Sequence, residues 1–488
     1  MPVQPGHVEN GSALRRPAPA MQFQTLIFAV FFVLVLSANW LLRRRDMPRK
    51  ILLVLASYYF YGAFNIFLLA VLGSSSLLNY LCGEGIHRAR EAGNKALQRA
   101  WFMAGIWLNL LALGMFKYYG FFQASLEDLL GRFNMSSHLP ILEIMLPVGL
   151  SFYTFQGLSY IMDLNRGKGL RARTVVDFLL YISFFPQLLS GPICRPKELL
   201  PQLHEGLPES IPEPGRAVSL ILSGLFKNVV LSHYLYMHIV GNVFNDPSDY
   251  SAPTLWVAMF AYALYIYVDF SGYTDLAVGL SLLLGIRIPH NFNHPYLATD
   301  VSNFWGRWHI TLSRWINDYL FVALGGRDIH RRWSALFWAW VLAGLWHGAA
   351  WTYILWGTYF ALALLLHHYL RSGIKKKWKG GVAGQLGTFL LVCFGWLIFA
   401  SPDLESLWAY LTGMWRFGAP GEGFEAFVLV VLALGAVMHI FGERLRSGFI
   451  RVHDAMPLAL RPVAWLAIGL VILALKPSGM SPNLYFGF

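Results

Sequence analysis

The sequence predicts an all-α, polytopic membrane protein with about a dozen transmembrane helices and additional interfacial or re-entrant helices. Of the 488 residues, 56% are hydrophobic and only 13% are charged, whereas charged residues make up about a quarter of a typical soluble protein. Apolar runs long enough to cross a bilayer recur along nearly the whole chain. These observations exclude a soluble enzyme with a single membrane anchor.

The first twenty residues differ from the rest of the chain. They are polar, rich in Pro and Gly, and contain no apolar segment of their own, which excludes a signal peptide. We expect residues 1–20 to form a disordered tail and residues 21–488 to form a single membrane domain. Met21 directly precedes the first apolar run and is a candidate translation start.

The expected transmembrane segments begin at 25–42, which is followed by the basic loop RRRDMPRK. The positive-inside rule places this loop in the cytoplasm, so the N-terminus faces outward. Two apolar stretches around GAFN within 51–81 lead to a second basic loop and predict a helical hairpin. Further spans are expected at 101–122, 146–162, 175–189, 218–244, 255–284, 334–350, 353–370, 386–400, 427–441 and 462–475.

The run 255–284 is too long for a single crossing of about 20 residues. Asp269, Gly272 and Asp275 lie in its middle and predict a break near DFSGYTD. The two carboxylates could form a proton pathway. The alternative is that the carboxylates pair with a basic side chain or cap the broken helix, and we favour this alternative by about two to one.

The segment 303–324 has a different character. Arg307, His309, Arg314 and Asp318 interrupt its aromatic residues too often for a helix that faces lipid. We therefore expect this segment to lie along the membrane interface or to line a wet cavity.

Several common functions lack support in the sequence. Lys and Arg, which give the net charge of +12, cluster in short loops as topology signals, so nucleic acid binding is not expected. Cys82, Cys194 and Cys393 are far apart and predict neither a disulfide nor a metal site. The motifs GxSxG, GxxxxGK[ST], GxGxxG and HExxH are absent from the sequence.

Two other pairs of histidines are interpreted as structural. His290 and His294 have a helical spacing in HNFNH, but the flanking prolines predict a loop, and a metal site receives about one chance in ten. His367 and His368 end an apolar span beside a basic loop, where a position at the interface explains them. No metal site is therefore expected.

The stretch LAGLWHGAAW contains an imidazole within an apolar span. On a helix, Gly344, His347, Gly348 and Trp351 share one face, and the glycines allow another helix to come close. A lone buried histidine that donates one hydrogen bond for packing would be the more frequent case. A second imidazole, His309, lies in the preceding polar segment, and two costly placements indicate a shared purpose. A buried, neutral imidazole is suited to taking a proton from a hydroxyl that attacks an acyl group.

Five ordered stretches resemble the membrane-bound O-acyltransferase family, and in particular its alginate O-acetyltransferase branch. They are LPVGLSFYTFQGLSYIMDL from Leu146, FFPQLLSGPI from Phe184, DFSGYTDLAVGL from Asp269, FNHPYLATDVSNFWGRWHITLSRWINDYLFVALGG from Phe292 and GLWHGAAWTYILWG from Gly344. The resemblance covers nearly all of the chain after Met21. It implies a ring of helices around a thin centre, with a cytoplasmic funnel for the acyl donor and an opposite opening for the acceptor.

The resemblance also implies roles for individual residues. His347 would be the principal catalytic histidine and His309 its companion. The candidates for lining the substrate channel are Asn303, Trp305, Trp308, Asp318, Trp346 and Trp351. Gly306 and Asn317 replace basic residues that are frequent in the related sequences, which puts the contacts to the donor at these two positions in doubt.

The implied function is O-acetylation of an exported polysaccharide such as alginate, by a protein of the bacterial inner membrane. Acetyl-CoA is the implied donor, no cofactor is bound permanently, and a periplasmic SGNH-like acetyltransferase is the implied partner. Two alternatives remain at this point. One is acyl transfer from a phosphopantetheinyl carrier protein, as in D-alanyl export, and the other is a non-catalytic transporter or scaffold subunit.

Overall fold

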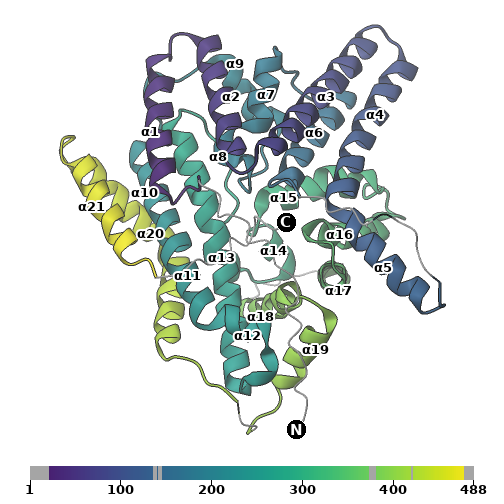
Figure 1. Cartoon of the computed structure of the whole chain (residues 1–488), viewed down its shortest axis with the longest axis vertical. Coiled ribbons are helices and arrows are strands. Elements are labelled where there is room, and N and C mark those ends of the chain that lie inside the picture. Colours follow the sequence, from purple (N-terminus) through teal and green to yellow (C-terminus); the bar gives the residue numbers. More distant parts are fainter. Residues whose placement is uncertain (1–20, 136–139, 141–145, 373–380, 419–420, 478–488) are drawn as a thin grey trace, which may run out of the picture.

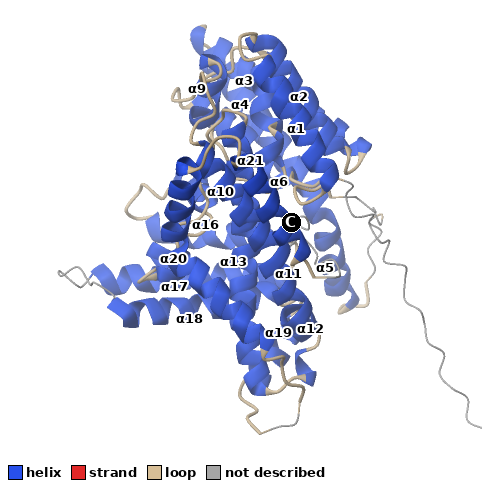
Figure 2. Cartoon of the chain, turned by 90° about the vertical axis from the view of Figure 1, so that its left-hand side faces the viewer, coloured by secondary structure: helices blue, strands red, loops and turns tan. Residues whose placement is uncertain are grey.

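The computed structural model describes residues 21–135, 140, 146–372, 381–418 and 421–477. The expected disordered tail at residues 1–20 lies outside this part. The described chain is helical, and its one β-bridge joins Tyr250 and Glu422. Figures 1 and 2 show the helices crossing one another in several directions.

The N-terminal helices form two hairpins, which occupy the upper part of Figure 1. Asn65 lies at the turn between the two hairpins and caps the first helix of the second one, because its side chain accepts a hydrogen bond from Phe67 N. The predicted hairpin within 51–81 is therefore confirmed. These elements are α1 (Leu26–Leu41), α2 (Asp46–Gly62), α3 (Ile66–Glu91) and α4 (Lys95–Leu113), which continues through the π-helical turn η1 (Gly114–Tyr118) into α5 (Tyr119–Gly131).

The span predicted at 175–189 is interrupted. Helix α7 ends at Ser183, and Phe184 has a non-helical backbone before the short helix α8. Pro186 explains the interruption, because in a continuous helix its ring would clash with the carbonyl of Ile182. The elements of this region are α6 (Leu150–Asn165), α7 (Val175–Ser183), α8 (Phe185–Leu188) and α9 (Pro196–Glu205), of which α6 is buried along most of its length.

A long continuous helix follows and packs against α13 (Ala252–Leu283). It comprises α10 (Pro214–Leu225), η2 (Phe226–Leu231), α11 (Ser232–Leu235), η3 (Tyr236–Val240) and α12 (Gly241–Asn245), and the short 3-10 helix η4 (Pro247–Asp249) separates it from α13. The backbones approach closely where Gly224 faces Gly272, since a Cβ atom on Gly224 would lie 2.6 Å from the Gly272 carbonyl oxygen.

The predicted break near DFSGYTD is wrong, because α13 runs without interruption for 32 residues. Asp269 Oδ1 accepts hydrogen bonds from Asn228 Nδ2 at 2.8 Å and Ser232 Oγ at 3.2 Å. Asp275 forms an ion pair with Lys227 at 2.7 Å. The neighbouring helix thus satisfies both carboxylates, which removes the need for a break and favours the structural alternative for Asp275.

The second half of the chain places short helices at the centre of the molecule and longer ones around them (Figure 1). The segment 303–324 is interrupted at 306–309 and does not form one span. The elements are η5 (Pro295–Leu297), α14 (Val301–Trp305), α15 (Ile310–Trp315), η6 (Ile316–Phe321), α16 (Arg332–His347), α17 (Trp351–Ser372), α18 (Gly381–Ala400), α19 (Leu404–Gly413), α20 (Phe427–Ala455) and α21 (Arg461–Ala474).

Six continuous helices within the described residues are long and apolar enough to cross a membrane: 66–91, 95–131, 214–245, 252–283, 381–400 and 427–455. Helices α1 and α21 are apolar but shorter. Large apolar side chains lie exposed on the outside, including Leu26 and Phe67, each 80% exposed. The protein is therefore a multi-pass membrane protein.

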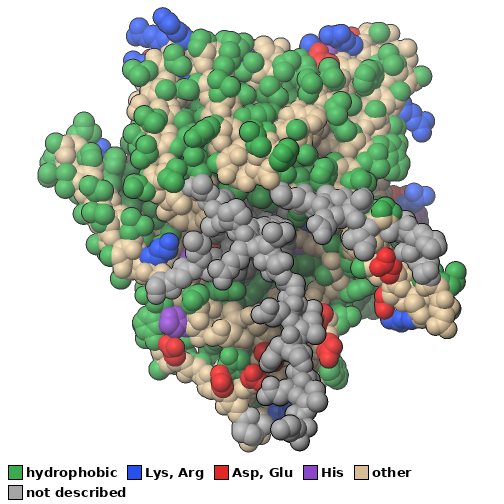
Figure 3. Space-filling model, viewed as in Figure 1, with side chains coloured by type: hydrophobic (Ala, Val, Ile, Leu, Met, Phe, Trp, Pro, Cys, Tyr) green, Lys and Arg blue, Asp and Glu red, His purple; other side chains and the backbone are tan. Residues whose placement is uncertain are grey.

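The charged side chains are unevenly distributed on the face shown in Figure 3. In Figure 3 hydrophobic side chains cover most of the sides, while Lys and Arg gather at the top, over the connections of the N-terminal hairpins. Asp and Glu are more frequent toward the bottom. This distribution agrees with the common side that the two basic loops predict, since arginines occupy both connections.

Candidate active site

His309 lies at the N-cap of α15 and is 1% exposed. Its backbone adopts the left-handed conformation, with φ of 41°, which is uncommon for a residue other than Gly and indicates a position fixed by its surroundings. The loop before α14 provides that fixation: Ile310 N donates to Asn291 O at 2.9 Å, and Thr311 Oγ1 donates to Asn291 Oδ1 at 2.6 Å.

The hydrogen bonds of Asn291 determine the tautomer of His309. Thr311 N points at Asn291 Oδ1 at 3.3 Å, and a backbone N–H can only donate, so this atom is the amide oxygen. His309 Nδ1 lies 3.3 Å from the same oxygen and must carry a proton to bond with it. A neutral ring then has its lone pair on Nε2, which is buried and has no hydrogen-bond partner within the described part of the chain.

The charge state of His309 follows from its burial. Desolvation lowers the pKa of His309 to about 3, because the cationic form loses its hydration in the protein interior. His309 is therefore neutral at physiological pH, with an unprotonated nitrogen available to accept a proton.

His347 is the last residue of α16 and is 6% exposed. The predicted continuous helical face through Trp351 is wrong, because Gly348 is extended (φ −166°, ψ 157°) and the next helix begins at Trp351. Trp351 is 57% exposed and contacts Phe121 with ring centroids 5.7 Å apart. It therefore lies on the periphery, away from His347.

The predicted close approach at Gly344 is confirmed. Helix α17 packs on α16 so tightly that a Cβ atom on Gly344 would overlap the carbonyl oxygen of Tyr353 and lie 2.9 Å from the Gly357 backbone. The two glycines thus allow backbone contact between the helices. This contact places His347, one turn after Gly344, against the side chains of α17.

Aromatic rings surround the His347 imidazole. The centroid distances are 4.7 Å to Trp346, 4.9 Å to Trp356 and 5.2 Å to Phe399. Trp346, Trp356 and two nearby tryptophans, Trp305 and Trp396, have buried indole N–H groups without an acceptor among the described residues. The cage is apolar at its ring faces but retains unused hydrogen-bond donors.

Lys117 secures the C-terminal end of α16. Its Nζ donates to the carbonyl oxygen of Trp346 and lies 3.4 Å from that of His347. The adjacent Tyr118 donates its hydroxyl to Leu345 O at 3.1 Å. A cation at the end of a helix satisfies carbonyls that lack intrahelical partners and complements the helix dipole. The π-helical turn η1 brings both side chains to this point.

The two histidines belong to one site. Phe152 links the two histidines. Its ring centroid is 6.5 Å from that of His309 and 6.0 Å from that of Trp346, which packs on His347. Both histidines lie outside the six long apolar helices. Burial lowers the pKa of His347 well below its ordinary value, and positive charge on His309 or Lys117 lowers this pKa further. The arrangement therefore holds two neutral imidazoles in a largely dry environment.

The other channel candidates occupy different positions. Trp305 and Trp308 are buried, and Trp308 packs on Trp396 at 4.6 Å. Asn303 binds its own loop, accepting from Arg307 Nε at 3.1 Å. Asp318, in the first turn of η6, forms an ion pair with Arg195 at 2.6 Å. The structure thus brings Trp305, Trp308 and Trp346 toward the histidines and assigns Asn303 and Asp318 structural contacts.

A cavity of about 450 Å³ lies beside α14, α15 and η6 and is closed on the other side by α16 and α17. The segment 303–324 therefore lines a cavity, as expected. Gly306, Arg314, Asn317 and Arg332 contribute to its polar lining. Trp305 forms part of its wall, and the Trp305 ring is 5.6 Å from that of Trp356, which packs on His347.

The remaining histidines and the cysteines form no metal site in the described residues. His290 and His294 lie in a loop, as predicted, and His290 Nε2 is 2.7 Å from an arginine nitrogen of Arg216. His367 lies 3.7 Å from Asp300. The three cysteines are buried thiols without a disulfide.

Three residues of the site were missed by the sequence analysis. Lys117 is a lone cation within the expected span 101–122. Because a charge in an apolar span is energetically costly, its presence there was a signal of a functional or structural role. Asn291 lies between the two histidines of HNFNH, and only these histidines were considered as candidates for a site. Trp356 joins the site only through helix packing, which leaves no local sequence signal.

Comparison with known proteins adds independent findings. The family model described as MBOAT, membrane-bound O-acyltransferase family, matches residues 173–401. A relative named probable alginate O-acetylase AlgI, from Pseudomonas aeruginosa, is 34% identical over 402 residues, which cover 82% of this chain and 75% of the relative. A peptidoglycan O-acetyltransferase from Helicobacter pylori is 33% identical over 397 residues, which cover 75% and 73%.

The name of a third relative specifies a D-alanyl group instead of an acetyl group. The teichoic acid D-alanyltransferase of Bacillus subtilis is 29% identical over 286 residues, which cover 54% of this chain and 71% of the relative. In each comparison the matched part is thus the larger part of the relative.

Proposed function

This chain belongs to the membrane-bound O-acyltransferase family and is an acyltransferase, and from this premise we propose that it acetylates an exported polysaccharide. The proposed donor is acetyl-CoA on the cytoplasmic side of the bacterial inner membrane. The acetyl group passes outward through a ring of helices with a central funnel, and the proposed final acceptor is a hydroxyl group of a polymer such as alginate. No permanently bound cofactor is needed for this chemistry.

One observation carries the proposal: His309 is buried and neutral, with its proton held on Nδ1 and its Nε2 lone pair uncommitted. His347 lies in the same aromatic enclosure. We assign His347 the role of general base or proton relay and His309 that of orienting or polarising the reacting groups. A buried neutral imidazole accepts a proton without first losing one to solvent.

The proposed reaction conserves atoms and charge. The acceptor hydroxyl oxygen attacks the acetyl carbonyl carbon, and a new C–O bond forms as the C–S bond to coenzyme A breaks. The His347 imidazole takes the hydroxyl proton and then passes it to the leaving thiolate. Indole N–H groups of Trp346 and Trp356 lack acceptors within the described chain and are available for the carbonyl oxygen as it becomes negative.

The cavity lined by Arg314 and Arg332 supports a donor site. Two guanidinium groups suit the phosphates of coenzyme A, since Arg binds phosphate through two parallel hydrogen bonds. Trp305 and Trp356 separate this cavity from His347. Gly306 and Asn317, which replace basic residues of related sequences, also line the cavity. In this proposal, Arg314 and Arg332 therefore contribute the positive charge of the donor site.

The proposed acceptor and partner rest on the relatives. Two relatives have names that specify O-acetylation of alginate or peptidoglycan, which are both polysaccharide-containing polymers outside the cytoplasm. We propose that a periplasmic SGNH-like acetyltransferase completes the transfer to the polymer. Loss of polymer acetylation on deletion of such a partner, with acetyl-CoA turnover by this chain retained, would test that division of labour.

A carrier-protein donor remains a second candidate because of the D-alanyltransferase relative. Competition decides between the two donors. If acetyl-CoA is the donor, an excess of phosphopantetheinyl carrier protein leaves the rate unchanged. A carrier protein that supplies the acyl group, or that blocks the use of acetyl-CoA, contradicts the proposed donor.

The central experiment uses purified full-length protein, labelled acetyl-CoA, a polysaccharide acceptor and the proposed periplasmic partner, and it follows thioester cleavage as well as acetyl transfer. We expect His347→Ala to lower acetyl transfer by roughly 10²-fold to 10⁴-fold while the protein still inserts and folds. His87→Ala is the control, because His87 pairs with Glu91 near the end of α3, far along the chain from the site. Full activity in a correctly inserted His347→Ala protein would falsify the assignment.

A further inference from the structure

A second cavity of the described structure lies apart from the proposed donor cavity. It has a volume of about 670 Å³ and is enclosed by α10, η2, α13, α20, α21 and the loop at 292–294. This volume is within the usual range of ligand sites, about 300–1,000 Å³. The function proposed above makes no use of this cavity.

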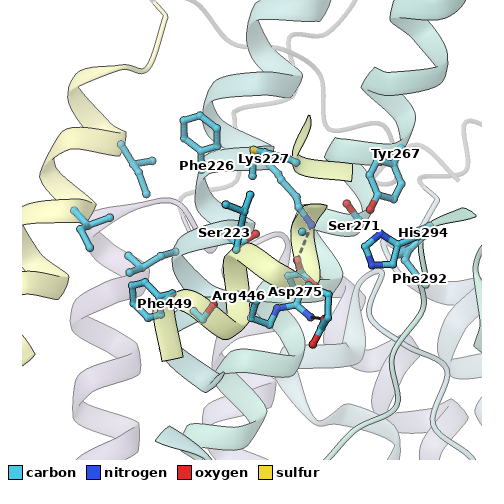
Figure 4. Close-up of a pocket in the computed structure, with 18 of the residues that line it drawn as sticks. Ser223, Phe226, Lys227, Tyr267, Ser271, Asp275, Phe292, His294, Arg446 and Phe449 are labelled. Carbon is cyan, nitrogen blue, oxygen red and sulfur yellow. Dashed lines mark hydrogen bonds and ion pairs between the residues drawn. The ribbon is translucent and has the colours of Figure 1, made fainter. Parts of the chain in front are cut away.

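The wall of this cavity is divided into an apolar side and a charged side. Helix α21 contributes Ile468, Val471 and Ile472. Figure 4 shows Phe226 and Phe449 toward that side, whereas Lys227, Asp275 and His294 lie at the centre and on the opposite side. A ligand that fills the cavity must therefore be amphiphilic.

The position of α21 indicates where such a ligand comes from. Ile472 is the one residue of α21 that is buried, and neighbours such as Leu470 and Val471 are 56% and 58% exposed. In a multi-pass membrane protein, an apolar helix with such exposure faces lipid. The apolar side of the cavity thus borders the hydrocarbon region of the bilayer.

The charged side contains equal numbers of cations and carboxylates. Lys227 pairs with Asp275 at 2.7 Å, and Arg446 pairs with Glu443 at 3.1 Å. Arg446 also has a buried Nε atom with no hydrogen-bond partner among the described residues. An unused guanidinium donor suits a phosphate oxygen, and the carboxylates beside it suit an ammonium group and disfavour a headgroup with net negative charge.

We propose that this cavity binds one glycerophospholipid with a phosphoethanolamine headgroup. The phosphate lies against Arg446, the ammonium group lies near the carboxylates of Glu443 and Asp275, and an acyl chain follows the apolar side chains of α21. Burial of aliphatic chain against this wall supplies the main driving force, and the paired charges select the headgroup.

The cavity also borders the support of His309. Asn293 and Phe292 line it, while Asn291, in the same loop, holds the His309 ring. Phe292 packs on Phe270 at 5.1 Å, and Phe270 packs on His309 at 4.7 Å. The lipid would therefore stabilise the loop that positions a histidine of the proposed active site.

The test measures lipid retention by native mass spectrometry on full-length protein in detergent. Dioleoyl phosphatidylethanolamine, dioleoyl phosphatidylglycerol and dioleoyl phosphatidylcholine are the probes, and soluble phosphoethanolamine tests binding of the headgroup alone. We expect one phosphatidylethanolamine per chain, bound about tenfold more tightly than the other two lipids, which corresponds to about 1.4 kcal/mol. Equal retention of the three lipids, preference for phosphatidylglycerol, or equal binding of soluble phosphoethanolamine overturns the proposal.

Two pairs of variants locate the site. Val471→Trp fills the cavity, whereas Leu470→Trp places the same bulk on the neighbouring residue, which does not line it. Arg446→Gln removes the guanidinium, and Arg444→Gln removes one from the same helix outside the cavity. We expect phosphatidylethanolamine retention to fall about tenfold in the first variant of each pair and to persist in the second.

A melting curve without added lipid verifies the folding of each variant. If Val471→Trp does not fold, the Arg446 pair decides the outcome alone. Retention that is unchanged in folded Arg446→Gln overturns the headgroup contact. These measurements require no acetyl transfer, so the lipid site and the proposed enzymatic function fail or stand separately.

Discussion

His309 donates its Nδ1–H to Asn291 Oδ1 across 3.3 Å, and this bond fixes which ring nitrogen can accept a proton. The same amide oxygen accepts from the backbone N–H and the side-chain hydroxyl of Thr311. The tautomer of the imidazole therefore depends on the loop that precedes α14 as much as on α15 itself.

The first prediction concerns this positioning bond. Asn291→Ala removes the acceptor and should lower kcat by roughly 10-fold to 100-fold, because the ring loses its fixed tautomer and orientation. Asn291→Asp retains an acceptor and favours the imidazolium, so the acid limb of the pH–rate profile should move to higher pH. Steady-state kinetics from pH 5 to 8 provide the measurement. A normal profile in Asn291→Asp and normal kcat in Asn291→Ala would contradict the role.

The second prediction concerns stability against pH. The pKa of His309 falls from an unfolded value of about 6.5 to about 3 in the folded protein. Between these values the unfolded state binds more protons, so the free energy of unfolding decreases as pH falls below 6.5. The contribution of one such group reaches about 1.4 kcal/mol per pH unit.

Thermal unfolding in detergent at pH 7, 6 and 5 checks this prediction. His309→Gln should show a smaller loss of Tm than the parent protein over this range, because the variant lacks the buried imidazole. Parallel curves for the two proteins would show that His309 does not titrate as its burial requires.

The third prediction concerns the contact between α16 and α17. Gly344→Ala should destabilise the protein by about 1–3 kcal/mol and reduce activity, because the added Cβ overlaps backbone atoms of α17. Gly387→Ala is the matched control, since no atom lies within 4 Å of a Cβ at this position on α18. Melting temperatures and acetyl transfer rates of both variants should separate. Equal behaviour of the two would show that the helices can move apart freely.

The fourth prediction concerns Lys117. Lys117→Met retains the apolar stem but loses the charge at the end of α16, which should cost about 1–2 kcal/mol of stability and reduce kcat by displacing His347. Lys95→Met, at the exposed N-terminus of α4, serves as the comparison. Unfolding midpoints and single-turnover rates measure the two effects. Unchanged kcat in Lys117→Met would limit Lys117 to folding.

The sequence was sufficient to predict the helical membrane architecture and several individual features. The hairpin of α2 and α3 followed from two apolar runs around a polar turn, and the loop around His290 followed from flanking prolines. The family was also recognisable, because five motifs in order are specific. Each of these features depends on local composition or on residues close together in the chain.

The wrong predictions have two physical causes, which are compensation from distant residues and the early end of a helix. Asp269 and Asp275 were expected to break α13, but Asn228, Ser232 and Lys227 on another helix satisfy them. Trp351 was expected beside His347, but the chain leaves the helix at Gly348. Helical periodicity specifies which residues would share a face only where the helix actually continues.

The backbone contact between Gly344 and Gly357 limits which dimensions of the site can be changed by substitution. Since no side chain lies between these glycines, the spacing of α16 and α17 cannot be adjusted by small substitutions, whereas the space around His347 depends on the side chains of Trp356 and Phe399. Attempts to make the enzyme accept larger acyl groups should therefore begin with those two rings.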